Sequence, residues 1–271
     1  MNGGPSIESC CELVVLAKID GHPTSAAIVG HNSAVTFIGP AARACAAGVV
    51  IAASVLLSGC VSTVAGTAVR AQNAGPIDVP RLNEAKLDHV LLSIGELNGI
   101  VGSTQMKVTS ELEEMTDHSG DVSDPDCLGA IYGAEEPVYA GSGWTAVRDQ
   151  VAREPSEDNE HWVEQTAVLY PSADRAQKFF DESKSSWEQC ANFSISVNDA
   201  DDTYLWQIDK VTAEDTLINQ VTTQKDAEGW ECQHALSIVS NVTVEAWACG
   251  YGIKDEAATI ADEMVANAAK K

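Results

Sequence analysis

Residues 230–251, WECQHALSIVSNVTVEAWACGY, contain two runs of β-branched, aromatic and small apolar residues around the dipeptide Ser240-Asn241. This pattern is typical of a β-hairpin with a short turn. Cys232 and Cys249 lie equally far from that turn, so they would face each other across the hairpin. With the turn at Ser240-Asn241, they occupy a non-hydrogen-bonded pair, where Cα atoms approach to about 4.5 Å, within disulfide range. The sequence therefore predicts a Cys232–Cys249 disulfide.

If Cys60 does not form a disulfide, Cys127 and Cys190 are the two cysteines that remain after residue 59. An even number of cysteines in an exported chain indicates disulfides, and we expect Cys127 to pair with Cys190. A metal site is the alternative interpretation. No CxxC spacing follows residue 60 and His234 is the only nearby histidine, so no bound metal is expected.

The apolar stretch at residues 44–57 follows Arg43 and precedes the sequence LSGC at 57–60. It is too short to span a bilayer, which needs about 20 residues, but it has the length of a signal-peptide core. LSGC resembles a bacterial lipobox, in which the cysteine receives a diacylglyceryl group and becomes the new N-terminus. Two acyl chains, of the palmitate type, on Cys60 would anchor the protein stably. The alternative is a buried core helix that ends in Gly-Cys.

This interpretation divides the chain into three parts. Residues 1–59 are expected to be a signal region, with translation starting near Val35 because acidic residues precede the apolar stretch. Residues 60–80 would be the lipidated Cys60 and a flexible tether of small residues. Residues 81–271 have the length of one globular domain, which we expect on the extracytoplasmic face of the cell membrane.

Composition limits the possible functions. The chain has 271 residues, of which 45% are hydrophobic, and its 40 acidic and 16 basic residues give a formal net charge of −24. Such a chain can bury a core. Its negative charge argues against nucleic-acid binding, which needs clustered Lys and Arg, and against binding to anionic lipid headgroups by charge.

Within residues 81–271, hydrophobic periodicity and turn signals predict an α+β domain with a largely antiparallel sheet and helices on one face. The order is helices, two strands, a helix, five strands and a helix. The expected segments are helices at 81–93 and 93–101, a loop at 111–126, strands at 144–154 and 161–170, a helix from Ser172 to Cys190, strands at 193–197, 203–211 and 216–225, the hairpin, and a helix at 255–270.

The helix after Ser172 has a distinct apolar face. Apolar and small residues recur there at steps of three and four, namely Ala176, Phe179, Phe180, Ser183, Trp187 and Cys190. Cys190 would therefore point towards the sheet, where a bond to Cys127 could hold the helix end. Ser93 and Glu96 similarly resemble a capping box at the start of the short helix.

Several of these segments together resemble the family of PknH-like extracellular sensor domains. They are LDHVLLSIGELNGIVG (87–102), DCLGA (126–130), VYAGSGW (138–144), WVEQTAVLYPSADRAQKFFDESKSSWEQC (162–190) and the two late cysteines. The resemblance covers residues 81–271. It implies an α+β domain of actinobacterial type with two disulfides and a cleft for an extracellular ligand. The sequence contains neither the kinase domain nor the transmembrane helix of the receptor kinases, and the lipid on Cys60 would replace them.

Three tryptophans and one arginine are candidates for the ligand site: Trp144, Trp162, Trp206 and Arg148. Ligand pockets combine aromatic surface with a few polar groups, and Arg148 could orient an anionic or polar ligand. The alternatives are that the tryptophans belong to the core and that Arg148 only balances nearby acidic residues.

No catalytic motif of the GxSxG, HExxH or SxxK type is present, so an enzyme and a cofactor are not expected. A triad assembled from distant residues is the alternative, although His234 is expected on the solvent side of its strand. Residues 141–146 match GxGxxA but are expected to form a turn, and the acidic residues at 121–126 and 199–202 are interpreted as solvated turns rather than calcium sites.

The sequence therefore predicts a non-catalytic, lipid-anchored sensor domain that binds a small molecule or a cell-envelope component. The alternative is an interaction lipoprotein that docks on an envelope protein such as a receptor kinase.

Overall fold

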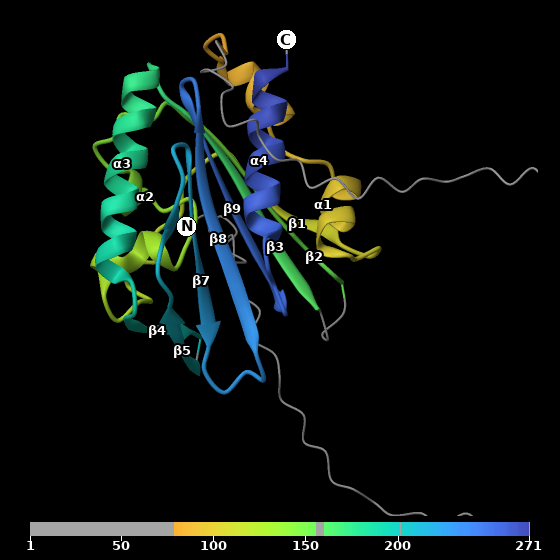
Figure 1. Ribbon diagram of the computed structural model, residues 1–271, viewed down its shortest axis with the longest axis vertical. Coiled ribbons are helices and arrows are strands. Elements are labelled where there is room, and N and C mark those ends of the chain that lie inside the picture. The colour runs from red at the N-terminus through yellow and green to blue at the C-terminus, as the bar shows by residue number, and fades with distance from the viewer. Residues whose placement is uncertain (1–78, 156–159, 201, 271) are drawn as a thin grey trace, which may run out of the picture. The chain divides into compact units, whose positions relative to one another are not determined.

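The computed structural model describes residues 79–155, 160–200 and 202–270 (Figure 1). The signal region, Cys60 and almost all of the tether lie outside these residues, so their assignments stay predictions. Within the described part, no helix combines the length and the apolar character that a membrane crossing requires.

A nine-stranded sheet forms the centre of the domain, with the order β1-β2-β3-β9-β8-β7-β5-β4 and β6 paired to β7. Every pair of neighbouring strands is antiparallel, which confirms the predicted sheet. The strands are β1 (Lys107–Leu112), β2 (Ala146–Arg153), β3 (His161–Leu169), β4 (Ser194–Asp199), β5 (Asp202–Ile208), β6 (Thr212–Ala213), β7 (Leu217–Gln224), β8 (Trp230–Val239) and β9 (Val242–Tyr251).

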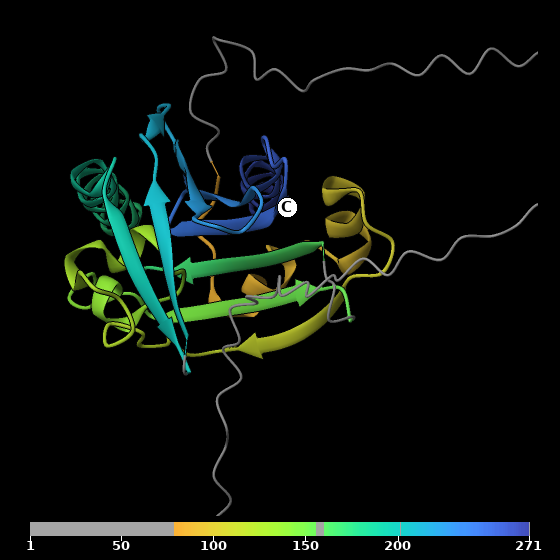
Figure 2. The same ribbon diagram turned by 90° about the horizontal axis from the view of Figure 1, so that it is seen from below.

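Helices cover both faces of this sheet, which corrects the expectation that they cover one. The helical segments are η1 (Glu84–His89), α1 (Ile94–Val101), η2 (Pro125–Ala130), α2 (Glu136–Tyr139), α3 (Ala173–Cys190) and α4 (Glu256–Ala269). One apolar core joins α3, η2 and α2 to the sheet, and a second joins η1, α1 and α4 to the opposite face. Figure 2 shows α3 and α4 apart from each other, with strands of the sheet between them. The central strands β8 and β9 are therefore buried almost throughout.

Both predicted disulfides are present. The β8–β9 register pairs Val239 with Val242 and Cys232 with Cys249, whose Cα atoms are 3.9 Å apart. Cys127 in η2 bonds to Cys190, the last residue of α3, with a Cα–Cα distance of 5.7 Å.

The apolar face of α3 is also confirmed, because the six residues predicted to face inward are the ones buried in this helix. The helix begins where the Ser172 hydroxyl accepts a hydrogen bond from the Arg175 backbone N–H. Ser93 and Glu96 form the predicted capping box of α1.

Four elements differ from the expectations. Strand β1 begins before the predicted loop 111–126, and η2 and α2 were not anticipated. The chain at 84–89 forms a 3-10 helix instead of an α-helix over 81–93. Strand β1 lies at the sheet edge with its side chains exposed or half-buried, so it has no apolar alternation to reveal it.

Asn241 fastens the start of the domain to the β8–β9 turn. Its side chain, 1% exposed, accepts a hydrogen bond from the Leu82 backbone N–H (2.8 Å) and donates to the carbonyls of Leu82 and Tyr170. These bonds satisfy buried backbone groups at three separate segments. The N-terminal segment is thereby held against the two central strands.

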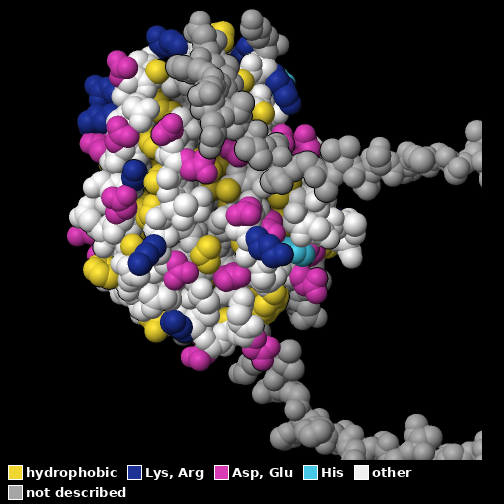
Figure 3. Space-filling view, viewed as in Figure 1, with side chains coloured by type: hydrophobic (Ala, Val, Ile, Leu, Met, Phe, Trp, Pro, Cys, Tyr) yellow, Lys and Arg dark blue, Asp and Glu magenta, His cyan; other side chains and the backbone are white. Residues whose placement is uncertain are grey.

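The surface carries charges of both signs. On the face in Figure 3, acidic side chains are interspersed with Lys and Arg side chains rather than gathered into one field. This distribution agrees with the absence of a basic stripe in the sequence.

Candidate functional site

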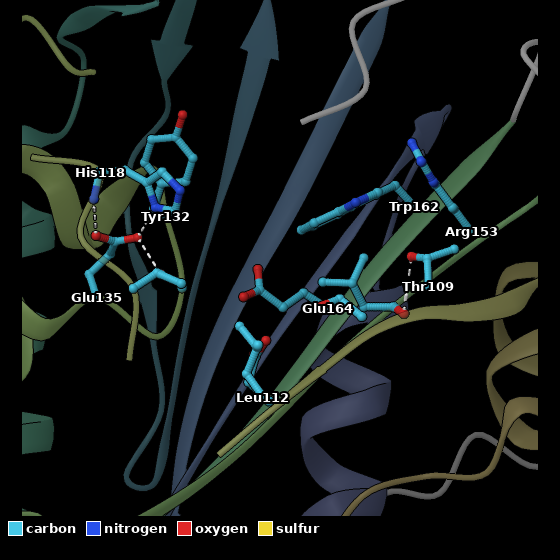
Figure 4. A pocket seen from close by; sticks show the side chains of 13 residues that line it. Thr109, Leu112, His118, Tyr132, Glu135, Arg153, Trp162 and Glu164 are labelled. Atoms are coloured by element: carbon cyan, nitrogen blue, oxygen red, sulfur yellow. Dashed lines mark hydrogen bonds and ion pairs between the residues drawn. The ribbon is translucent and has the colours of Figure 1, made fainter. Parts of the chain in front are cut away.

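A pocket of about 140 Å³ lies where β1, β2 and β3 meet the segment 116–135 (Figure 4). Side chains alternate between the two faces of a strand, so Asp149 and Val151 of β2 both face this pocket. The antiparallel register places Glu164 of β3 beside Val151, and Trp162 lies two residues away on the same face. The volume of the pocket is below the roughly 300 Å³ of a drug-sized site, so the pocket suits a small ligand group.

Glu135 forms one side of the pocket together with His118. Glu135 is 1% exposed, and its carboxylate accepts hydrogen bonds from the His118 backbone N–H (2.7 Å) and the Thr116 hydroxyl (3.0 Å). The same carboxylate contacts His118 Nδ1. The His118 ring in turn stacks on Tyr132, with ring centroids 4.7 Å apart. These contacts compensate the Glu135 carboxylate within the protein and place Tyr132 along the pocket.

Asp149 is a buried carboxyl group without a basic partner. It is 4% exposed, and it accepts a hydrogen bond from the Thr166 hydroxyl at 2.6 Å. No Lys, Arg or His in the described ranges forms an ion pair with it. Burial raises the pKa of Asp149 to about 6. Hydrogen bonds with Thr166 and Glu164 oppose this rise in the pKa, whereas the nearby charges of Glu245 and Glu135 add to it.

Gly133 provides room for the Glu164 carboxylate. A Cβ atom built at position 133 would lie 3.1 Å from both carboxylate oxygens of Glu164. In Figure 4 this carboxylate points into the space between Tyr132 and Trp162. A larger residue at 133 would therefore displace the carboxylate from the centre of the pocket.

A second cavity, of about 20 Å³, adjoins the first and shares Tyr132, Trp162 and Glu164 with it. Trp206, Trp247 and the Cys232–Cys249 disulfide contribute to its lining. Both of these tryptophans are 4% exposed, and neither indole Nε1 has a hydrogen-bond partner within the described part of the chain. Buried polar groups are normally hydrogen-bonded, so two unused donors beside a cavity indicate a place for an acceptor.

His234 stacks on Trp247, which lines this cavity, and is buried instead of lying on the solvent side of its strand, which corrects the prediction. It is fully buried, its Nε2 lies 2.6 Å from Glu245, and its ring is between Trp187 and Trp247, at centroid distances of 4.0 and 3.9 Å. Tyr139 donates a hydrogen bond to the other oxygen of Glu245. Burial lowers the pKa of His234 despite the opposing effect of Glu245, so the ring is neutral near pH 7.

The structure brings together two of the four predicted ligand residues. Trp162 lines both cavities and Trp206 lines the smaller one. Trp144 packs against the same apolar core but contributes to neither cavity. Arg148 projects from β2 to the opposite face, where its Nε lies 2.8 Å from Asp88 and 3.6 Å from Glu113. It therefore balances acidic residues there, and it is not part of this pocket.

Sequence reasoning missed the polar residues of the site. Asp149 nevertheless stands out in the sequence pattern. It shares a strand face with Val147 and Val151, where the alternation predicts an apolar residue, so a carboxyl group there is unusual. Glu135, His118 and Tyr132 come from irregular chain, whose side-chain directions follow no period.

Comparison with known proteins identifies the relatives of this domain. The family described as PknH-like extracellular domain matches residues 82–267. The serine/threonine-protein kinase PknH of Mycobacterium bovis is 39% identical over 191 residues, which are 70% of this chain and 32% of the kinase. The PknH of Mycobacterium tuberculosis is also 39% identical over 191 residues, covering 30% of that kinase. The chain thus spans about a third of the length of these relatives.

A solved structure agrees with these matches. The crystal structure of the extracellular domain of PknH from Mycobacterium tuberculosis superposes with a TM-score of 0.68 at 37% sequence identity. The superposition covers 71% of this chain and 99% of that one. The similarity therefore includes almost all of the crystallised domain and confirms both the predicted fold class and the predicted resemblance.

Proposed function

Since the chain belongs to the family of PknH-like extracellular domains, we propose that residues 81–271 form a non-catalytic sensor domain that binds a small molecule or cell-envelope component in the pocket over β1–β3. The observation that carries this proposal is a pocket lined by both the buried carboxyl group of Asp149 and the ring of Trp162. Aromatic surface with a few convergent polar groups is typical of ligand sites.

A binding role fits the histidines better than catalysis does. His161 and His234 each pair with a glutamate, Glu154 and Glu245 respectively. Ser103 donates its hydroxyl hydrogen to Glu154 and not to the imidazole of His161. A hydroxyl nucleophile needs a base within hydrogen-bond reach, and among the described residues no Ser or Thr hydroxyl is hydrogen-bonded to either of these imidazoles.

The alternative function is docking on an envelope protein such as a receptor kinase. A docking surface of this kind would require a contiguous apolar patch. The exposed large hydrophobic residues in the described ranges lie on or beside four different strands; they are Val108, Phe193, Leu205 and Tyr251. The pocket therefore has the stronger support.

We further propose that a lipid on Cys60 holds the domain at the extracytoplasmic face of the membrane. The motif LSGC at 57–60 supports this placement. Replacing Cys60→Ser in the full chain is expected to abolish incorporation of labelled palmitate and to move the protein from the membrane fraction to the soluble fraction. Ser58→Ala, which leaves the cysteine in place, serves as the control. Unchanged labelling and membrane fractionation of the Cys60 variant would contradict the lipid anchor.

Ligand binding is tested by native mass spectrometry of the full chain after incubation with an extract of the host envelope. Truncating Trp162→Ala is expected to remove the bound species, because this ring lines both cavities. Phe193→Ala removes an aromatic ring that is 52% exposed and away from the pocket, so it should retain the bound species. Trp162→Phe keeps most of the packing volume and should show weakened binding in a folded protein. Retention of the same species by both Trp162 variants would refute this site.

A further inference from the structure

Extending the proposed function, on which it rests, we infer that the ligand carries a primary ammonium group, which binds beside the carboxyl groups of Asp149 and Glu164 and against the rings of Trp162 and Tyr132. A hydrogen-bond acceptor in the same ligand would meet the indole N–H groups of the adjoining cavity.

The balance of charge favours a cation. Glu135 already interacts with His118, whereas Asp149 is buried with only a hydroxyl and another carboxyl group as partners. A buried carboxylate without a positive partner is costly, and a bound cation would compensate it. Across the described residues, no group of three or more His, Cys, Asp or Glu is arranged to hold a metal ion. An organic cation therefore fits better than a metal.

The aromatic walls favour the same ligand chemistry. Trp162 and Tyr132 both line the main pocket, and the Glu164 carboxylate points between them (Figure 4). The faces of Trp and Tyr rings attract cations within about 6 Å. An ammonium group also offers three hydrogen-bond donors, which suits a pocket whose buried carboxyl groups are acceptors. Arg153, the lining arginine, lies beyond Trp162 as seen from Glu135.

The donors of the smaller cavity indicate a second functional group in the ligand. Trp206 and Trp247 offer indole N–H donors that no described residue uses. This cavity shares Trp162, Tyr132 and Glu164 with the main pocket, so both can contact one small molecule. An acceptor oxygen a few bonds from the ammonium nitrogen would satisfy these donors. The ligand class is therefore a primary amine with a neighbouring hydroxyl or carbonyl group.

Ethanolamine and ethylene glycol are matched probes, because they differ in replacing an ammonium group by a hydroxyl group. We would titrate the isotope-labelled full chain, with both disulfides formed, at pH 7.5 and follow the indole N–H signals by NMR. Ethanolamine is expected to bind at least about tenfold more tightly than ethylene glycol and to shift the Trp206 and Trp247 signals. Equal affinities would overturn the cation in favour of a neutral polyol, and no shift with ethanolamine would overturn the ammonium class.

Charge removal at the site gives an independent readout. Asp149→Asn should weaken ethanolamine binding at least about tenfold, because it removes the charge and keeps the shape. Asp88→Asn is the control, because it makes the same change on the opposite face of the sheet. This variant should bind ethanolamine with the affinity of the wild type. Thermal unfolding would verify that both variants are folded. Unchanged affinity in folded Asp149→Asn would refute the inference.

The pH dependence follows from the groups that face Asp149, which are Glu164 and Thr166 on β3, Glu135 before α2, and Glu245 on β9. Ethanolamine stays protonated from pH 5 to pH 7.5, whereas Asp149 loses its proton near pH 6. Binding should therefore be about tenfold weaker at pH 5 than at pH 7.5. A flat profile would contradict the role of Asp149. If ethanolamine fails these tests while binding of the species from the envelope extract still requires Trp162, the ammonium ligand is refuted and the proposed function stands.

Discussion

Removing the Cys127–Cys190 disulfide, by replacing both cysteines with alanine, is expected to lower the free energy of unfolding by about 4 kcal/mol. The bond closes a segment with a sequence separation of 63, so its loss frees a long loop in the unfolded chain. Both cysteines are also at least 97% buried, and their truncation loosens the contact between η2 and α3. Urea denaturation followed by tryptophan fluorescence would measure the change.

The second disulfide provides the comparison. Cys232 and Cys249 are separated by 17 residues, so the same chain-entropy reasoning gives about 3 kcal/mol for their replacement. The strands β8 and β9 are also paired along their whole length, so this bond is not their sole connection. A smaller loss for Cys127–Cys190 than for Cys232–Cys249 would show that loop closure does not govern the stability here. Weaker ligand binding should accompany loss of Cys127–Cys190, because η2 leads directly into Tyr132 and Glu135.

Replacing Asp149→Asn is expected to raise the free energy of unfolding by about 3 kcal/mol at pH 8. Folding raises the pKa of Asp149 from 3.8 to about 6, so the folded protein holds the proton more tightly than the unfolded chain. The wild type therefore gains stability as the pH falls through about 6 towards 4, and loses that contribution as the pH rises. Asparagine mimics the protonated carboxyl group at every pH.

The difference in the free energy of unfolding between Asp149→Asn and the wild type should consequently vanish near pH 4. At pH 8 it corresponds to a rise in Tm of roughly 6–12 °C for a domain of this size. The lowered pKa of His234 works in the opposite direction, since the unfolded chain takes up that proton first as the pH falls below about 6.5. This contribution is common to both proteins and cancels in the difference. Equal stability of the two proteins at pH 8 would contradict the raised pKa. A variant that is more stable yet binds less ligand would identify Asp149 as a group retained for function.

Much of the fold could be predicted because the sequence pattern of several segments is compatible with only one register or one buried face. The symmetry of Cys232 and Cys249 about residues 240–241 determines the hairpin register, and the spacing from Ala176 to Cys190 determines the inner face of α3. Burial of β8 and β9 on both sides removes the alternation that would assign a side chain to one face. His234 was therefore misplaced, and the second layer of helices was not foreseen.

The site itself could be predicted only in part. Trp162 and Trp206 were selected as aromatic surface near polar residues, and both line cavities. Arg148 was selected by sequence proximity, but neighbouring strand residues point to opposite faces, so its distance along the chain was misleading. The pairing of Glu135 with His118 depends on the path of irregular chain between β1 and α2, which local patterns do not determine.

The bonds between Asn241 and Leu82 have a mechanical consequence. A pulling force that enters at residue 79 would be resisted first by these bonds, and hence by the two central strands rather than by a sheet edge. If the bonds rupture, the chain from 79 to 92 would peel from the sheet face that carries α4. The cavities lie on the other face, so the N-terminal segment would yield under load while the cavities keep their shape.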